Sequence, residues 1–356
     1  FYSEDMSADF FFNNFSVDLN KNFFQIENAS IRSQGVVSVI CDGVFKNKLT
    51  SSNNYPVFNS SSESISFKIF DDINVVSGFE LRGESISLNK NGNPIHILIK
   101  DDNNNYKVTS KRFQISNNSL SSSDSRFSIS NHLDSIYHPV VKFSYNDFSQ
   151  KIFIDRVSGQ RGLNPIRNSF HGLNMFADRL EIDLVYDNCL LFHYAPGTDI
   201  EVLFESDNYF ENSRYNDLFN LDVNVFGLLF GFLNEKNDSL EEINYDQIYF
   251  IKDFCDFNNL DFETAISYLI KFEIFGFLDY NRFDKNFKIK PWAFKFVDAV
   301  DAKCDYDVLK IEALAGIGDT IAEIDLLLNT MDIFRVNKIN ITDRFDFEIY
   351  PMSNKL

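Results

Sequence analysis

The chain has 356 residues, of which 44% are hydrophobic, and a formal net charge of −19. That length and apolar content suit two or three domains with packed cores and argue against general disorder. Because the 33 Lys and Arg are scattered, a nucleic-acid backbone or an anionic membrane surface would repel the chain, so neither is an expected partner.

The four cysteines lie far apart and form no CxxC pair. This spacing indicates reduced thiols and not a disulfide framework or a zinc site. No apolar run is long enough to cross a bilayer, so we expect a cytoplasmic protein without direct membrane insertion. The sequence begins at Phe1 and not at Met, so an N-terminal segment with a targeting signal can precede it.

Residues 1–118 are predicted to form a β-rich domain. The stretch 64–70 alternates apolar and polar residues, as a half-buried strand does. Asn91-Gly92 between two apolar runs is the strongest hairpin signal in the chain. The Asn- and Ser-rich stretches 51–64 and 116–125 are predicted to be exposed loops, the second of them a linker.

Residues 126–238 are predicted to form a second β-rich domain, closed by a helix over 218–233. The Gly-, Arg- and Asn-rich stretch 156–172 indicates a long loop. We expect strands at 127–129, 140–145, 150–156, 180–186 and 200–204, because these runs are short, apolar and β-branched.

Residues 240–300 follow a helical pattern instead. Helices are predicted over 243–257 and 260–275, with Asp261 as the N-cap of the second. A hairpin follows, with strands predicted at 277–280 and 283–296 and its tip near 281–284. Helix, turn, helix and hairpin are the element order of a winged helix.

The second of these helices has the wrong side chains for reading DNA. A DNA reader presents Arg, Lys, Asn or Gln to the base edges, whereas Asp261, Glu263 and Glu273 outnumber Lys271 here. We therefore predict that the segment docks to protein, with Phe272 and Phe275 as contact residues.

Residues 301–356 are predicted to be a helical segment over 306–332, interrupted at Gly316 and Gly318, with short terminal strands at 334–341 and 345–350. Their role is not indicated by the sequence. The expected fold class is therefore α+β and multidomain: β-rich, sandwich-like domains, then a winged-helix-like module, then a helical and β C-terminal segment.

The sequence carries no catalytic, cofactor or metal signature that we can identify, so we expect a protein that is not an enzyme and needs no cofactor. Arginines outweigh acidic residues in one place, around Arg156, Arg161, Arg167 and Arg179. Two interpretations stay open. These side chains pair with carboxylates of their own chain, or their loop clamps a partner subunit, since guanidinium groups suit interface carboxylates.

Gly35–Ile40 leads into Gly43-Val44-Phe45, and a predicted strand at 64–70 follows. This stretch and a later one resemble the TssF family of type VI secretion baseplate wedge proteins. The family's "YSVDRVSG" motif corresponds either to Ile73–Gly78 by order or to Ile154–Gly159 by letters. Later, 197–204, 207–210 and the helix at 218–233 resemble the family's "G-x-E-(I/V)-x-L…F" strand and closing helix.

The resemblance covers at most about two thirds of the chain, and residues 240–356 lie outside it. It implies a structural wedge subunit of a contractile injection system. The implied partners are TssG-like, TssK-like and TssE-like subunits, a VgrG-like spike and a second copy of the chain. The implied location is a cytoplasmic baseplate docked at the inner membrane.

A different class of function stays open beside it. The charge of −19 also suits an acidic adaptor or DNA mimic in a phage defence or counter-defence system, because carboxylates can imitate phosphates.

Overall fold

The computed structural model describes residues 2–349 apart from 4–5, 15–16, 18–20, 51, 71–72, 102, 117, 132–133, 158–163, 195–199, 212–224, 238–242, 302 and 342–347. The predicted α+β class is confirmed, because strands predominate and the described residues include four helices. None of the helices in this described part has both the length and the apolar character needed to span a bilayer.

The chain forms two compact units, and each is described by itself. Unit 1 comprises residues 1–157, 179–191 and 323–330, and unit 2 comprises residues 158–178, 192–322 and 331–356. Both units are therefore discontinuous in sequence. The four-segment division predicted from the sequence stays a prediction.

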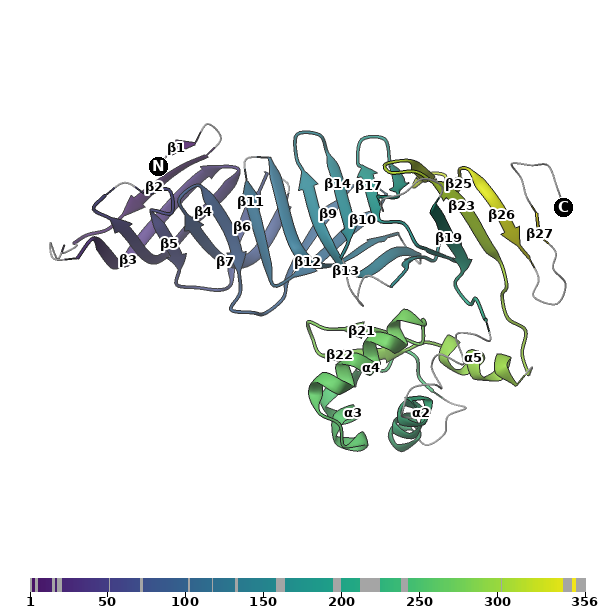
Figure 1. The fold of residues 1–356 in the computed structure, drawn as a ribbon. Helices are drawn as coiled ribbons and strands as arrows, with labels where there is room; N and C mark the ends of the chain where they lie inside the picture. Colours follow the sequence, from purple (N-terminus) through teal and green to yellow (C-terminus); the bar gives the residue numbers. More distant parts are fainter. Residues whose placement is uncertain are drawn as a thin grey trace. The chain divides into compact units, whose positions relative to one another are not determined.

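Unit 1 is built from antiparallel strands (Figure 1). They are β1 (Tyr2–Ser3), β2 (Met6–Phe11), β3 (Phe23–Gly35), β4 (Val37–Lys48), β5 (Val57–Ser60), β6 (Ile65–Ile69), β7 (Ile73–Arg82), β8 (Ser85–Asn89), β9 (Ile95–Lys100), β10 (Asn105–Ser110), β11 (Arg112–Ser116), β12 (Ser119–Ser130), β13 (Ser135–Asn146), β14 (Lys151–Arg156), β17 (Arg179–Asp183) and β18 (Asn188–Phe192).

The core of unit 1 follows from two-residue periodicity. In β9 the side chains of Ile95, Ile97 and Ile99 are buried, whereas the residues between them are exposed. Antiparallel pairing then sets Ile97 opposite Val108 of β10, and Val108 opposite Phe127 of β12. Apolar rows therefore run across the strands on one face, which is the main way in which such a sheet is stabilised.

Unit 2 combines one antiparallel sheet, in the order β15-β16-β19-β23-β26-β27, with a helical module. Its elements are β15 (Ile166–Asn168), β16 (Leu173–Met175), β19 (Ile200–Ser206), α2 (Val225–Lys236), β20 (Tyr249–Phe250), α3 (Ile251–Asn258), α4 (Phe262–Ile274), β21 (Leu278–Asn281), β22 (Asn286–Ile289), α5 (Trp292–Val300), β23 (Lys310–Ala315), β24 (Thr320–Asp325, its last three residues in unit 1), β25 (Thr330–Ile333), β26 (Val336–Asn340) and β27 (Glu348–Ile349).

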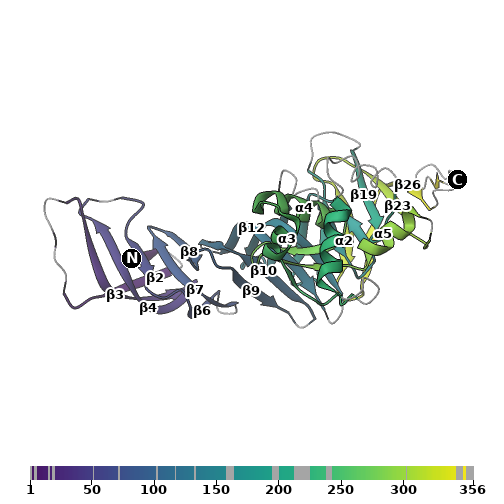
Figure 2. The ribbon, with the colours of Figure 1, turned by 90° about the horizontal axis from the view of Figure 1, so that it is seen from below.

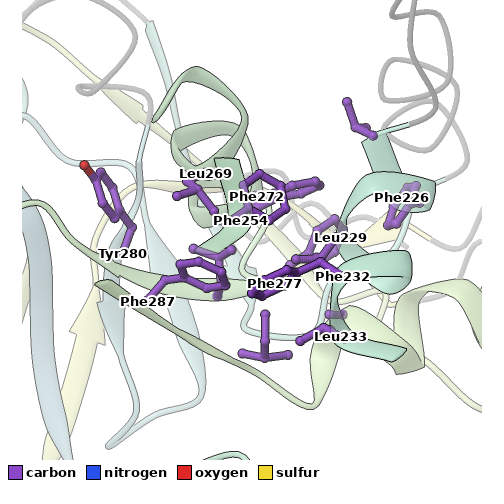
Figure 3. Close-up of a cluster of buried hydrophobic side chains, with 14 of the residues drawn as sticks. Phe226, Leu229, Phe232, Leu233, Phe254, Leu269, Phe272, Phe277, Tyr280 and Phe287 are labelled. Carbon is purple, nitrogen blue, oxygen red and sulfur yellow. The ribbon is translucent and has the colours of Figure 1, made fainter. Parts of the chain in front are cut away.

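The helical module has helix, turn, helix and hairpin in the predicted order, but its first helix begins at Ile251 and not at 243, because strand β20 precedes it and pairs with β22. The N-cap at Asp261 is confirmed, since its side chain accepts a hydrogen bond from the Thr264 backbone. Helices α2 to α5 lie together in both ribbon views (Figure 2). Aromatic side chains fill their core, where Phe232, Phe254 and Phe287 approach one another within about 6 Å (Figure 3).

The C-terminal prediction of a helix over 306–332 is wrong, because this stretch contains β23 and β24. The Gly316–Gly318 break is a turn between strands and not between helices. Short apolar runs such as these are compatible with both the helical period and the strand period. The pairing of β23 with β19 and β26 makes this stretch part of the sheet.

Three further local predictions need correction. The expected linker at 116–125 is mostly β12, and the expected loop at 51–64 contains β5, whose Phe58 is fully buried. Low-complexity Ser and Asn runs can lie in a sheet where their neighbours supply the apolar side chains. The second arm of the hairpin ends at Ile289, and helix α5 follows where a strand to 296 was expected.

Candidate interaction surface

Three hairpin tips of unit 1 share one five-residue turn, at residues 146–150, 183–187 and 325–329. Each turn begins with Asn or Asp, and each ends with a residue in the left-handed region. The φ angles of these final residues are 52° at Gln150, 51° at Asp187 and 52° at Asn329. The three hairpins therefore share one turn conformation, with the same kinds of residue at its two ends.

The opening residue anchors each turn through its side chain. Asp325 Oδ1 accepts hydrogen bonds from the backbone N–H groups of Leu327 and Leu328, at 2.9 and 2.8 Å. Asp183 makes the same pair of bonds, at 3.0 and 3.2 Å, and Asn146 accepts one from the N–H three residues on, at 2.9 Å. These bonds replace solvent contacts and hold the tips in one conformation.

The three tips lie next to one another. The N–H of Leu184 donates to the carbonyl of Gln150 at 3.0 Å, and the N–H of Leu326 donates to the carbonyl of Asp187 at 2.8 Å. In both bonds the acceptor is the left-handed residue of the neighbouring tip. The row crosses six strand ends and is therefore about 24 Å long at the usual strand spacing. β14 and β17, which carry two of these tips, are neighbours in Figure 1.

Each tip exposes large apolar side chains, which we call the tip surface. Two aromatic rings of this size can bury on the order of 300 Å², and apolar patches on monomers that reach about 300–600 Å² are often functional. The tip surface consists of Phe148, Val185, Tyr186, Leu327 and Leu328, each between 54% and 87% exposed.

The tip surface is acidic as well as apolar. The three turns contain Asp147, Asp183, Asp187 and Asp325 and no Lys or Arg. The nearby cation is Lys151, which lies 2.7 Å from Glu181 and 3.5 Å from Asp183. The hydrogen bond to Glu181 is the main cause that raises the pKa of Lys151. Its charge is thus matched by its own strand neighbours.

The arginines predicted as interface residues make contacts inside the chain, where the structure describes them. Arg179 donates to Asp155 in unit 1, and Arg167 donates to the backbone carbonyl of Glu273 in unit 2. Arg156 lies in β14 and is half-buried. Arg161 lies outside the described residues. For Arg179 the contact favours pairing with a carboxylate of its own chain, whereas Arg167 contacts a backbone carbonyl of its own chain and not a carboxylate.

The two phenylalanines predicted as docking residues belong to the module core. Phe272 is fully buried, so its side chain is not available to a partner. Phe275 is partly buried and stacks on Phe277 with ring centroids 5.8 Å apart. The apolar face of α4 points inward because the module has to bury it to fold.

A buried charged group supports the module from inside unit 2. Glu273 is buried and accepts a hydrogen bond from the Tyr280 N–H at 3.1 Å, while Lys290 lies 2.8 Å from Asp279. Burial, and then the nearby Arg167, lower the pKa of Lys290, and Asp279 opposes them. These contacts join β15, α4 and the hairpin, so the role that they indicate for Arg167 is structural.

Signs of catalytic chemistry are weak in the part of the chain that the structure describes. No group of three or more His, Cys, Asp or Glu within it could hold a metal ion. Burial, followed by the neighbouring Asp307, raises the pKa of Asp207. Burial also raises the pKa of Cys189, and a neutral thiol is a poor nucleophile.

The tip surface was missed by the sequence analysis. Residues 180–186 were expected to be strand throughout and 306–332 helical, and residues 146–149 lie between two predicted strands, so the three turns were not recognised as alike. One signal could have found it: Asn or Asp, then an apolar residue two positions later, then Gln, Asp or Asn at the fifth position, as at 146–150, 183–187 and 325–329.

A comparison with models of protein families, with curated proteins and with solved structures finds no match to this chain. The resemblance to TssF therefore rests on the quoted sequence motifs alone.

Proposed function

We propose that this chain is a non-catalytic subunit that docks to other proteins through its tip surface. The observation that carries the proposal is the row of three anchored turns that exposes Phe148, Tyr186 and Leu328 to solvent. Aromatic and aliphatic side chains on a rigid frame lose little conformational freedom on binding, which makes them effective anchors in protein interfaces.

The assembly that we propose is a type VI secretion baseplate, in which the chain takes the place of the wedge subunit. The support for this step is the resemblance of 35–80 and 197–233 to the TssF family. The wedge would be held by interfaces with TssG-like, TssK-like and TssE-like subunits, and obligate interfaces commonly bury more than about 2,000 Å². The tip surface would form the apolar centre of one of them.

Cross-linking in the native cell tests the proposal. A photo-reactive amino acid is placed at position 148 or 186, and at the exposed Ile40 of β4 as a matched control in unit 1. We expect cross-links from 148 and 186 to a small set of proteins that the control does not give. Sheath, spike or TssG-like proteins among them would support the baseplate assignment.

Two results would contradict the proposal. Equal cross-linking from all three positions would show that the tips contact nothing specific. Displacement of DNA from a basic enzyme by the purified chain, unaffected by changes at the tips, would favour the acidic adaptor or DNA mimic instead.

A further inference from the structure

We infer that the tip surface binds a protein whose contacting face is apolar at its centre and basic at its rim. This inference rests on the proposed function, because it specifies the partner of the same surface. Three features of the molecule support it: the apolar side chains of the tips, the carboxylates around them, and the turn of the same design in unit 2.

The apolar centre of the partner follows from the exposed side chains. Phe148, Tyr186 and Leu328 are the most exposed members of the tip surface. Their turns are fixed by side-chain to backbone hydrogen bonds and by bonds between neighbouring tips. A partner therefore meets side chains on an ordered backbone, and their burial is favourable only against an apolar face.

The basic rim follows from the charges. Asp147 and Asp325 are half-buried carboxylates in the same turns as the apolar side chains, and the three turns contain no cation. Asp183 is paired with Lys151, and Oδ1 of Asp187 is buried, so these two carboxylates are not counted at the rim. A second copy docking through the same surface would bring two more carboxylates towards Asp147 and Asp325. Phosphate backbones and anionic lipids would be repelled in the same way, whereas Lys or Arg at the rim of a partner would be attracted.

The β21–β22 hairpin of unit 2, which we call the wing, shows that the turn itself does not require this charge pattern. Residues 281–285 form the same turn, in which Asn281 Oδ1 accepts from the N–H groups of Phe283 and Asp284. Its closing left-handed residue is Lys285, with φ 54°, and its second residue is Arg282. Asp147 stands at the position of Arg282 in the first tip, and Asp187 stands at the position of Lys285 in the second. These two carboxylates are therefore features of individual tips and not requirements of the turn.

The test uses two fluorescent helical peptides of defined chemistry, one amphipathic with Leu and Lys, the other with Leu and Glu. The purified full chain is titrated into each, and binding is followed by fluorescence anisotropy. We expect the Leu/Lys peptide to bind at least about tenfold more tightly than the Leu/Glu peptide. The triple variant Phe148→Ser/Tyr186→Ser/Leu328→Ser should lose at least about tenfold in affinity for it.

Two matched variants separate charge and folding from apolar contact. Asp147→Asn/Asp325→Asn keeps an acceptor oxygen at both positions, and Asn146 shows that Asn can open this turn as Asp325 does. The variant should weaken the binding of the Leu/Lys peptide and not that of the Leu/Glu peptide. Ile40→Ser removes an exposed apolar side chain of unit 1 outside the tips and should change nothing. The thermal midpoint of each variant verifies that it is folded.

Several outcomes would overturn the inference. They are equal binding of both peptides, equal loss in Ile40→Ser, tip-dependent binding to phosphatidylcholine vesicles, or a dimer that the triple variant abolishes. If the peptides show no preference while cross-links from 148 and 186 still reach specific proteins, the inference fails and the proposed function stands. If those cross-links are absent too, the proposed function fails with it.

Discussion

Residues 146–150 in unit 1 and 281–285 in unit 2 adopt the same turn, but the side chains at its third position differ in exposure. Both begin with Asn, place Phe third and end in the left-handed region. Phe148 is 87% exposed, whereas Phe283 is half-buried with the Arg282 guanidinium 4.6 Å from its ring. The turn therefore fixes the backbone and leaves the displayed side chains free to differ, and the difference marks the unit 1 tips as a contact surface.

Of the changes that test this difference between the two turns, removal of the tip side chains should have the largest effect, and the affected quantity is the affinity for the partner. The variant with Ser at Phe148, Val185, Tyr186, Leu327 and Leu328 is expected to bind its cross-linked partner about a thousandfold more weakly, because central apolar contacts dominate interface energies. Binding is measured by titration with the purified partner. Phe283→Ser, which changes the matching position of the wing, should bind as the wild type does.

Arg167→Glu should act on the fold of unit 2 and not on binding at the tips. The substitution would place a carboxylate close to Glu273 and Asp279, and it would remove the hydrogen bond from Arg167 to the Glu273 carbonyl. We expect a loss of about 3 kcal/mol in the free energy of unfolding, as for a buried charge left without its partner. Chemical denaturation measures it. A stable variant with weakened assembly would instead support a partner-clamping role for this arginine.

The turn anchors should be equivalent in the two units. Asp325→Ala and Asn281→Ala each remove the acceptor of two backbone hydrogen bonds. Each is expected to cost about 1–2 kcal/mol. Asp325→Asn should cost almost nothing, because Asn opens two turns of this design. A large loss in Asp325→Asn would show that the carboxylate charge itself stabilises the tip.

Low pH should weaken the helical module through its N-cap. Hydrogen bonds that Thr264 donates to the Asp261 carboxylate, first from its hydroxyl and second from its backbone N–H, lower the pKa of Asp261. Since the folded pKa lies below the unfolded one, this stabilisation is present above the ordinary carboxylate pKa and is lost as the pH falls through the lowered value. The thermal midpoint of wild type should therefore fall more steeply than that of Asp261→Asn between about pH 5 and pH 2. Parallel profiles would contradict this role.

Relief of the left-handed backbone should have the smallest effect. Asn329→Gly removes the Cβ that disfavours φ 52° and should raise the stability by about 0.5 kcal/mol. Partner binding should be unchanged, because Asn329 is outside the tip surface. Calorimetry and the binding titration measure the two quantities, and a fall in stability would show that the Asn side chain contributes more than the backbone costs.

Much of the local structure could be predicted from the sequence. The alternation at 64–70, the helix at 260–275 and its cap at Asp261 are all present. These features depend on neighbours in the chain: strand alternation on a two-residue period, and capping on a carboxylate close to free N–H groups. Strand β12 across the expected linker and strands β23 and β24 in the expected helix depend instead on partners far away in sequence.

The sequence by itself determined the α+β class, the acidic charge and the order of elements in the helical module. Only the tertiary structure decided which phenylalanines are exposed, because burial depends on what packs against a side chain and not on its identity. It buried Phe272 and left Phe148 in solvent. It also brought residues 150 and 184, and 187 and 326, within hydrogen-bond distance, since strand pairing joins segments that no local pattern connects.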